Sequence, residues 1–129
     1  MEDVNFSDDF CGFLQTSIAA VEVAEILLYL RRNAAASHTA REVAAGLKPG
    51  TAISEVDVEK HIEMLRARDL VVLDAEKRAR FQPATEALRA HADTLAAAYS
   101  ERPVTLIRVI YALRDAKIKT FADAFRIKR

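Results

Sequence analysis

The sequence has little cysteine, glycine and proline, no tryptophan, and no excess of either charge. The single cysteine, Cys11, excludes an internal disulfide and with it a disulfide-stapled secreted fold. Three glycines and three prolines in 129 residues are too few for a turn-rich all-β fold. Nineteen basic and nineteen acidic residues give a formal net charge of zero, which excludes a uniformly basic nucleic-acid-binding coat.

Long uninterrupted apolar runs are also missing. The longest apolar segment, 18–30, is interrupted by Glu22 and Glu25 and is too short and too charged to span a membrane. The acidic first three residues lack the basic start of a signal peptide. We therefore expect a cytoplasmic protein with no membrane partner. Apolar residues make up 51% of the chain, enough for the packed core of one domain over residues 1–129.

The charges are distributed unevenly along the chain. Residues 1–60 have a net charge of −5 and residues 61–129 a net charge of +5, which predicts a dipolar surface. The last thirteen residues contain one acid, Asp123, and five bases, namely Lys117, Lys119, Arg126, Lys128 and Arg129. This end is either a solvated basic tail or a segment that contacts phosphates or an acidic protein surface.

Apolar spacing predicts helices in the first part of the chain. A helix is expected to begin at Ser7-Asp8-Asp9, with one stripe formed by Phe6, Phe10 and Phe13. A second helix is predicted over 17–32, with one apolar face formed by Val23, Ile26, Leu27 and Leu30.

Two shorter helices follow, each with its own start signal. Thr39 and Glu42 form a Thr-x-x-Glu capping box for a helix over 39–47, which Gly46 and the 48–50 segment end. Ser54, followed by early acids, is the expected N-cap of a helix over 54–68.

The second half alternates strand and helix patterns. Residues 70–82 predict a small β-hairpin with a polar turn at 74–77. Helices are expected from 83 to about 100 and again from Pro103, where Leu106, Ile107, Ile110 and Tyr111 form the predicted face. A last helical segment contains Ile118, Phe121, Ala122 and Phe125. The predicted fold class is mainly α with a small β-hairpin.

The order of elements over 17–83 resembles the winged helix-turn-helix of MarR-like and ArsR-like bacterial transcriptional regulators. The segment 39–44 resembles the start of the second helix of that fold, and 58–71 the end of its third helix entering the wing. The resemblance implies a winged-helix core over 17–83, extra N- and C-terminal helices with a C-terminal extension over 84–129, and double-stranded DNA binding as a homodimer.

If the resemblance holds, helix 54–68 enters the major groove and the hairpin touches the phosphate backbone. The DNA-binding residues expected on this basis are Thr39, Arg41, Lys48, Ser54, Lys60, Lys77, Arg78 and Arg80. Two simpler interpretations stay open: the hairpin cations are merely solvated, and Thr39 only caps its helix.

The proposed third helix departs from the usual pattern, because Glu55, Asp57 and Glu59 precede its first base, Lys60. Acids approaching a phosphate-lined groove have the wrong sign unless bases neutralise them. The alternative is a winged-helix protein–protein interaction module without DNA binding. The acids also fit a plain role as partners of the helix dipole.

Catalytic, metal and cofactor sites are not expected. His38, His61 and His91 are far apart in the sequence and have no partner at metal-ligand spacing. Cys11 beside the Phe stripe is expected to be a small core residue. The sequence has no glycine-rich phosphate loop and no Ser/His/Asp arrangement, so we do not expect an enzyme.

The aromatic residues at the two ends of the chain have two possible roles. The Phe6–Phe10–Phe13 stripe and the Phe121, Phe125 pair either cover the same core from both termini or form a dimer interface. In the second case the interface would also include Leu88, Leu95, Tyr99, Ile107 and Ile110.

Overall fold

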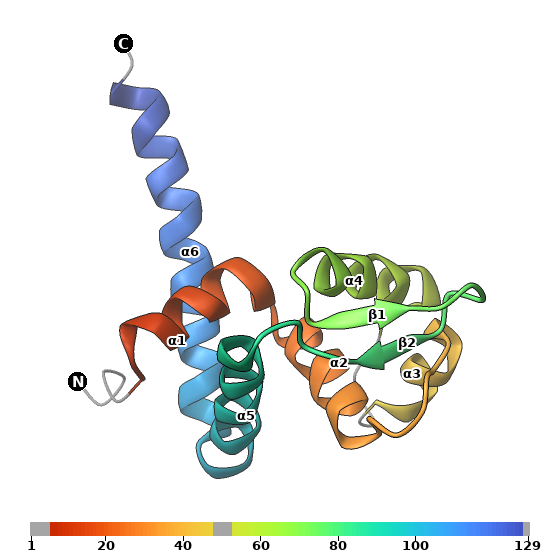
Figure 1. Ribbon diagram of the computed structural model, residues 1–129. Helices are drawn as coiled ribbons and strands as arrows, with labels where there is room; N and C mark the ends of the chain where they lie inside the picture. Colours follow the sequence, from red (N-terminus) through yellow and green to blue (C-terminus); the bar gives the residue numbers. More distant parts are fainter. Residues whose placement is uncertain (1–5, 48–52, 128–129) are drawn as a thin grey trace.

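The computed structural model describes residues 6–47 and 53–127, with side chains described up to Asp115 (Figure 1). Over these residues it is mainly helical, with one two-stranded antiparallel sheet, which confirms the predicted fold class at that level. In chain order the elements are α1 (Asp8–Phe13), the π-helix η2 (Leu14–Ile18), α2 (Val21–Arg32), α3 (Ala40–Gly46), α4 (Glu55–Ala67), β1 (Val71–Leu73), β2 (Ala79–Phe81), α5 (Glu86–Glu101) and α6 (Pro103–Ile127).

The starts of α1, α3 and α4 lie where their capping residues predict them. The Ser7 hydroxyl oxygen accepts the Phe10 N–H at the start of α1, and Ser54 caps α4 in the same way. At α3 the capping box is complete: Thr39 Oγ1 accepts the Glu42 N–H at 3.1 Å, and Glu42 Oε1 accepts the Thr39 N–H at 2.9 Å. These local signals are confirmed because each satisfies backbone donors that a helix leaves free.

The single helix expected over 17–32 is wrong at its start. Residues Leu14–Ile18 form a π-helix, Ala19 takes a left-handed φ of 59°, and α2 begins only at Val21. The axis bends by 98° between the two helical stretches. Because of the bend, Leu14 and Ile18 and the apolar face of α2 are all buried in one core, so tertiary packing overrides local helix propensity.

The two strands of the hairpin pair in one register, and a third segment of the chain pairs with β2. Val71 pairs with Phe81 and Leu73 with Ala79. His38, just before α3, forms an isolated bridge to Ala79, with N–H···O distances of 2.8 and 2.7 Å in the two directions. β2 therefore lies between β1 and the chain entering α3, and this pairing ties the hairpin to the helices.

The core has α2 at its centre. This helix packs against α3, α4, α5, β2 and η2, and its buried residues are Val23, Ala24, Ile26, Leu27, Leu28 and Leu30. Phe6, Phe10 and Phe13 are buried in the same cluster, which confirms the core role of the N-terminal stripe. In Figure 1, α3, α4 and the hairpin lie on one side of the molecule, and α1, α5 and α6 on the other.

α6 differs from its predicted form in two respects. It is one continuous helix rather than two segments. Its buried stripe in the described part is Leu106, Val109 and Ile110, whereas Tyr111, expected in the packed face, is 47% exposed. The C-terminal half of α6 extends beyond the rest of the chain in Figure 1. Phe121 and Phe125 lie outside the residues whose side chains are described, so their core role stays a prediction.

Candidate functional site

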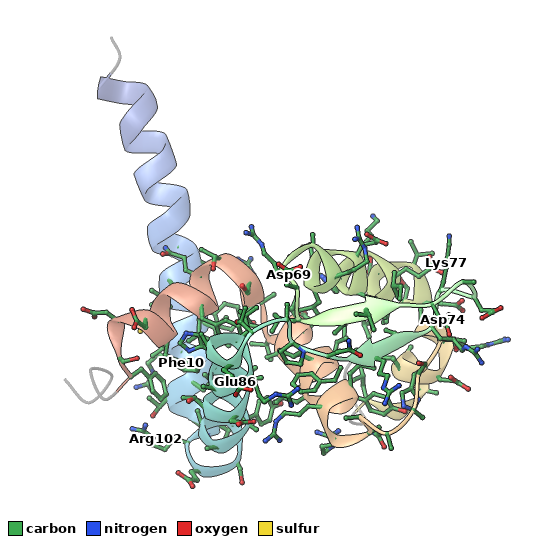
Figure 2. All side chains as sticks on the ribbon, in the orientation of Figure 1. Phe10, Asp69, Asp74, Lys77, Glu86 and Arg102 are labelled. Atoms are coloured by element: carbon green, nitrogen blue, oxygen red, sulfur yellow. The ribbon has the colours of Figure 1, made fainter. Side chains whose placement is uncertain are left out.

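The candidate site is the surface formed by α3, α4 and the turn between β1 and β2. Val58, Ile62 and Leu65 are the buried side of α4. The remaining side is exposed, and it includes Glu55, Val56, Asp57, Glu59, Lys60, Glu63 and Met64. Figure 2 shows these side chains on the ribbon, with Asp74 and Lys77 labelled at the far end of the hairpin. An exposed helix beside a protruding hairpin gives two adjacent elements that a macromolecule can contact.

Thr39 and Ser54, the two hydroxyl-bearing residues expected to bind DNA, serve as helix caps. Thr39 Oγ1 and Ser54 Oγ each accept a backbone N–H at 3.1 Å. The capping interpretation is therefore confirmed, and a phosphate contact by either residue stays a prediction. Of the predicted cations, Arg41 and Lys60 are exposed and form no ion pair within the part of the chain that the structure describes. Lys48 lies outside the described residues.

Arg78 is held inside the hairpin turn. Its Nε donates to Asp74 Oδ2 at 2.9 Å and its Nη2 donates to Glu76 Oε1 at 3.3 Å. The backbone N–H of Arg78, together with its guanidinium, lowers the pKa of the Asp74 carboxyl, and the hydrogen bond to Asp74 raises the pKa of Arg78. Its charge is thus balanced within the turn, which the spacing of charges in the sequence does not reveal.

Lys77 lies against α4. It has a left-handed φ of 62° and lines a cavity of about 120 Å³ whose wall also includes Glu59 and Glu63. The hydrogen bond from Arg66, 2.8 Å long at Nη2, lowers the pKa of Glu63, and the charge of Lys77 adds to the effect. The turn therefore places Lys77, one of the predicted DNA-binding cations, beside the acidic residues of α4.

Arg80 ties the hairpin to the turn after α2. Its side chain is exposed, and its Nε donates to the Ala34 carbonyl oxygen at 3.3 Å. Residues 37–82, the segment that contains the candidate surface, have eight bases and eight acids and therefore no net charge. The structure thus places Lys77 beside α4 and holds Arg78 in ion pairs within the turn. Arg41 and Lys60 are exposed and form no ion pair among the described residues.

The three histidines and Cys11 lie on different parts of the fold: His38 just before α3, His61 on α4, His91 on α5 and Cys11 on α1. Among the described residues no group of three or more His, Cys, Asp or Glu is placed to hold a metal ion. His61 on α4 is half-buried, and its Nδ1 is buried without a hydrogen-bond partner. Cys11 packs against the core, and burial together with the charge of Asp8 raises the pKa of its thiol. A raised pKa keeps the thiol protonated and therefore weakly nucleophilic.

One hydrogen bond between two helices was not predicted from the sequence. Tyr99 on α5 donates its hydroxyl to Glu25 Oε2 on α2 at 2.6 Å, across 74 positions of sequence. Burial and this hydrogen bond to a carboxylate raise the pKa of Tyr99 to about 12. The pair borders a cavity of about 120 Å³ also lined by Leu28, Arg32 and Leu47. Nothing in the local sequence of either residue indicates the other.

Replacing Tyr99 by phenylalanine is expected to lower the free energy of unfolding by about 1 kcal/mol at neutral pH. The folded-state pKa of Tyr99 lies above its unfolded value near 10, so this contribution is complete below pH 10 and is lost as pH rises to about 12. Urea unfolding at pH 8 and at pH 11 measures it, and the wild-type advantage over the variant should shrink at the higher pH. An equal advantage at both would contradict the hydrogen bond.

Comparisons with protein-family models, with curated proteins and with solved structures give no match to this chain. Within the described residues no single helix has the length and apolarity to cross a membrane, although the bent pair 8–18 and 21–32 passes that test when taken together.

Proposed function

We propose that the segment from α2 to β2 is a winged-helix unit that binds double-stranded DNA, with α4 in the major groove and the β1–β2 turn on the phosphate backbone. The observation that supports this best is the pairing of His38 with Ala79. Through this pairing, the chain between α2 and α3 lies beside β2 as a short third edge of the sheet. The order of elements is then α2, this edge, α3, α4 and the β1–β2 hairpin, which is the order found in winged helices. The proposed DNA binding is inferred from this order of elements and from the exposed side of α4.

The dimensions of the surface suit a duplex. α4 has 13 residues and is therefore about 20 Å long, and an α-helix fits the major groove. Lys60 on α4 and Arg41 on α3 are open to meet phosphates. Lys77 and Arg80 of the hairpin are exposed as well, while Arg78 is already paired with Asp74. We expect Arg78 to contribute less to binding than Lys60 or Arg80.

A second candidate function is docking of another protein on α4. It is favoured by the exposed acids Glu55, Asp57 and Glu59, because these would attract a basic protein segment and repel phosphates. The neutral sum over 37–82 fits such a module equally well.

Fluorescence anisotropy with a random-sequence duplex of about 25 base pairs distinguishes the two functions. For DNA binding we expect saturable binding at about 50 mM salt that weakens steeply with added salt, because phosphate contacts release counterions. Lys60→Glu and Arg80→Glu are each expected to reduce affinity about tenfold for all sequences. Arg108→Glu, the same charge reversal at an exposed position of α6, is the matched control and should bind like the wild type.

The circular dichroism spectrum and melting temperature of each variant must match those of the wild type for this comparison to hold. If the folded wild-type protein binds neither random nor genomic duplexes at about 20 mM salt, the DNA-binding proposal is wrong, and protein docking becomes the better use of α4.

A further inference from the structure

One line of residues on α4 points directly away from the core. The buried residues of the helix are Val58, Ile62 and Leu65. At about 100° per residue, positions 56, 60 and 67 lie within about 30° of the direction opposite that buried side. These positions hold Val56, Lys60 and Ala67, all exposed, and Glu63 and Met64 lie on the two sides of this outer line. If α4 enters a major groove, the outer line points toward the base edges.

The residues on and beside the outer line differ in what they can contact. Ala67 is the last residue of α4 and has a short side chain. Lys60 is a long cation, which suits a phosphate. The Glu63 carboxylate already accepts two hydrogen bonds from Arg66, at 2.8 and 3.0 Å. Val56 lies in the first turn, is 59% exposed and presents an apolar side chain to whatever α4 meets.

Neither helix stability nor core packing explains a valine at position 56. A β-branched residue is less favourable in a helix than alanine or leucine, because its side chain is restricted about χ1. At 59% exposure Val56 also adds little to the core, whereas Val58 is 0% exposed. The same restriction makes an exposed valine a rigid apolar group, which loses little conformational entropy when it is covered.

We propose that Val56 contacts the C5-methyl group of a thymine and so gives the protein a preference for duplexes with a thymine facing the first turn of α4. Among the four bases, thymine is the one that presents a methyl group in the major groove, and apolar side chains are what contact it. The N-terminal residues of a helix in the groove are the ones placed at base edges. This inference rests on the proposed insertion of α4 into the major groove.

The apolar surface at Val56 has the size of one methyl contact rather than of a protein interface. Its neighbours in the chain, Glu55 and Asp57, are exposed acids. The other large exposed apolar residue of α4, Met64, lies about 12 Å further along the helix axis. A stable protein interface buries about 800 Å² on each partner and has an apolar centre. A single valine among charged residues therefore fits a base edge better.

Replacing thymine by uracil removes the methyl group and keeps the base pair, so it tests the contact directly. By fluorescence anisotropy at about 50 mM salt, we expect the wild type to bind a random-sequence thymine duplex of about 25 base pairs about three- to fivefold more tightly than the same duplex made with uracil. Val56→Ser should bind both duplexes equally, and Val56→Ile should keep the preference. Val104→Ser, the same substitution at a 66% exposed valine of α6, is the matched control and should keep the wild-type ratio.

Val56→Ser should melt within about 2 °C of the wild type, because the side chain is exposed. Selection from a random DNA pool should recover sites with a fixed thymine for the wild type and with any base at that position for Val56→Ser. A wild type that binds both duplexes with equal affinity would overturn the thymine contact and leave the DNA-binding proposal standing. So would a thymine preference that Val56→Ser retains. Binding to neither duplex would overturn both proposals.

Discussion

Replacing Leu27 by alanine is expected to lower the free energy of unfolding by about 3–4 kcal/mol, the largest loss of stability we predict for this chain. Leu27 is 0% exposed and lies on α2, the helix that packs against α3, α4, α5, β2 and η2. The substitution removes buried methyl groups from the centre of the core and leaves a cavity that several elements would have to close together. A domain of this size is stable by only about 5–15 kcal/mol, so about a fifth or more of its stability would be lost.

Thermal and urea unfolding, both followed by circular dichroism, measure this effect, and a melting temperature lower by about 10 °C is expected. Val56→Ala is the matched control, because Val56 is 59% exposed on α4 and its truncation should change stability by less than about 0.5 kcal/mol. A Leu27→Ala protein within about 1 kcal/mol of the wild type would mean that α2 is not the centre of the core.

Sequence reasoning succeeded where the physical cause is local. Thr39 and Glu42 satisfy each other's backbone donors within one turn, so their pattern alone identifies the start of α3. The strands of the hairpin and the end of α4 near Asp69 are also short-range features, and both lie where they were expected. Gly46 was expected only to end its helix; in the structure a side chain there would also collide with Tyr29, because a Cβ would lie 2.8 Å from Tyr29 Cζ.

Reasoning from the sequence failed where distant segments decide the outcome. The break at Ala19 allows α1 and α2 to bury their apolar faces in one core. The sequence has no glycine or proline at that point from which the break could be predicted. The burial of Val109 rather than Tyr111 depends on which side of α6 meets the other helices. At the candidate site, the spacing of charges indicated a cationic hairpin, but the folded turn pairs Arg78 with Asp74 and Glu76.

Neutralising two acids of α4 is expected to strengthen duplex binding about 10- to 30-fold at low salt. Glu55 and Glu59 are exposed on the helix that we place in the major groove, where each opposes the phosphates by roughly 1 kcal/mol. The variant Glu55→Gln/Glu59→Gln removes that repulsion and keeps the Ser54 cap, whose oxygen binds the Asp57 N–H. Loss of the acid in the first turn costs about 0.3–1 kcal/mol of stability through the helix dipole.

Anisotropy with the same random duplex measures this gain, and Glu22→Gln/Glu86→Gln is its matched control. Those two residues are exposed first-turn acids of α2 and α5, so the control has the same change of net charge and the same kind of helix-dipole loss outside the candidate surface. If α4 enters the groove, the first variant gains affinity for every sequence and the control does not. Equal small gains in both would show that only net charge matters and that α4 lies away from the DNA. If neither variant binds DNA, the acids on α4 are better explained as a surface for a basic protein segment.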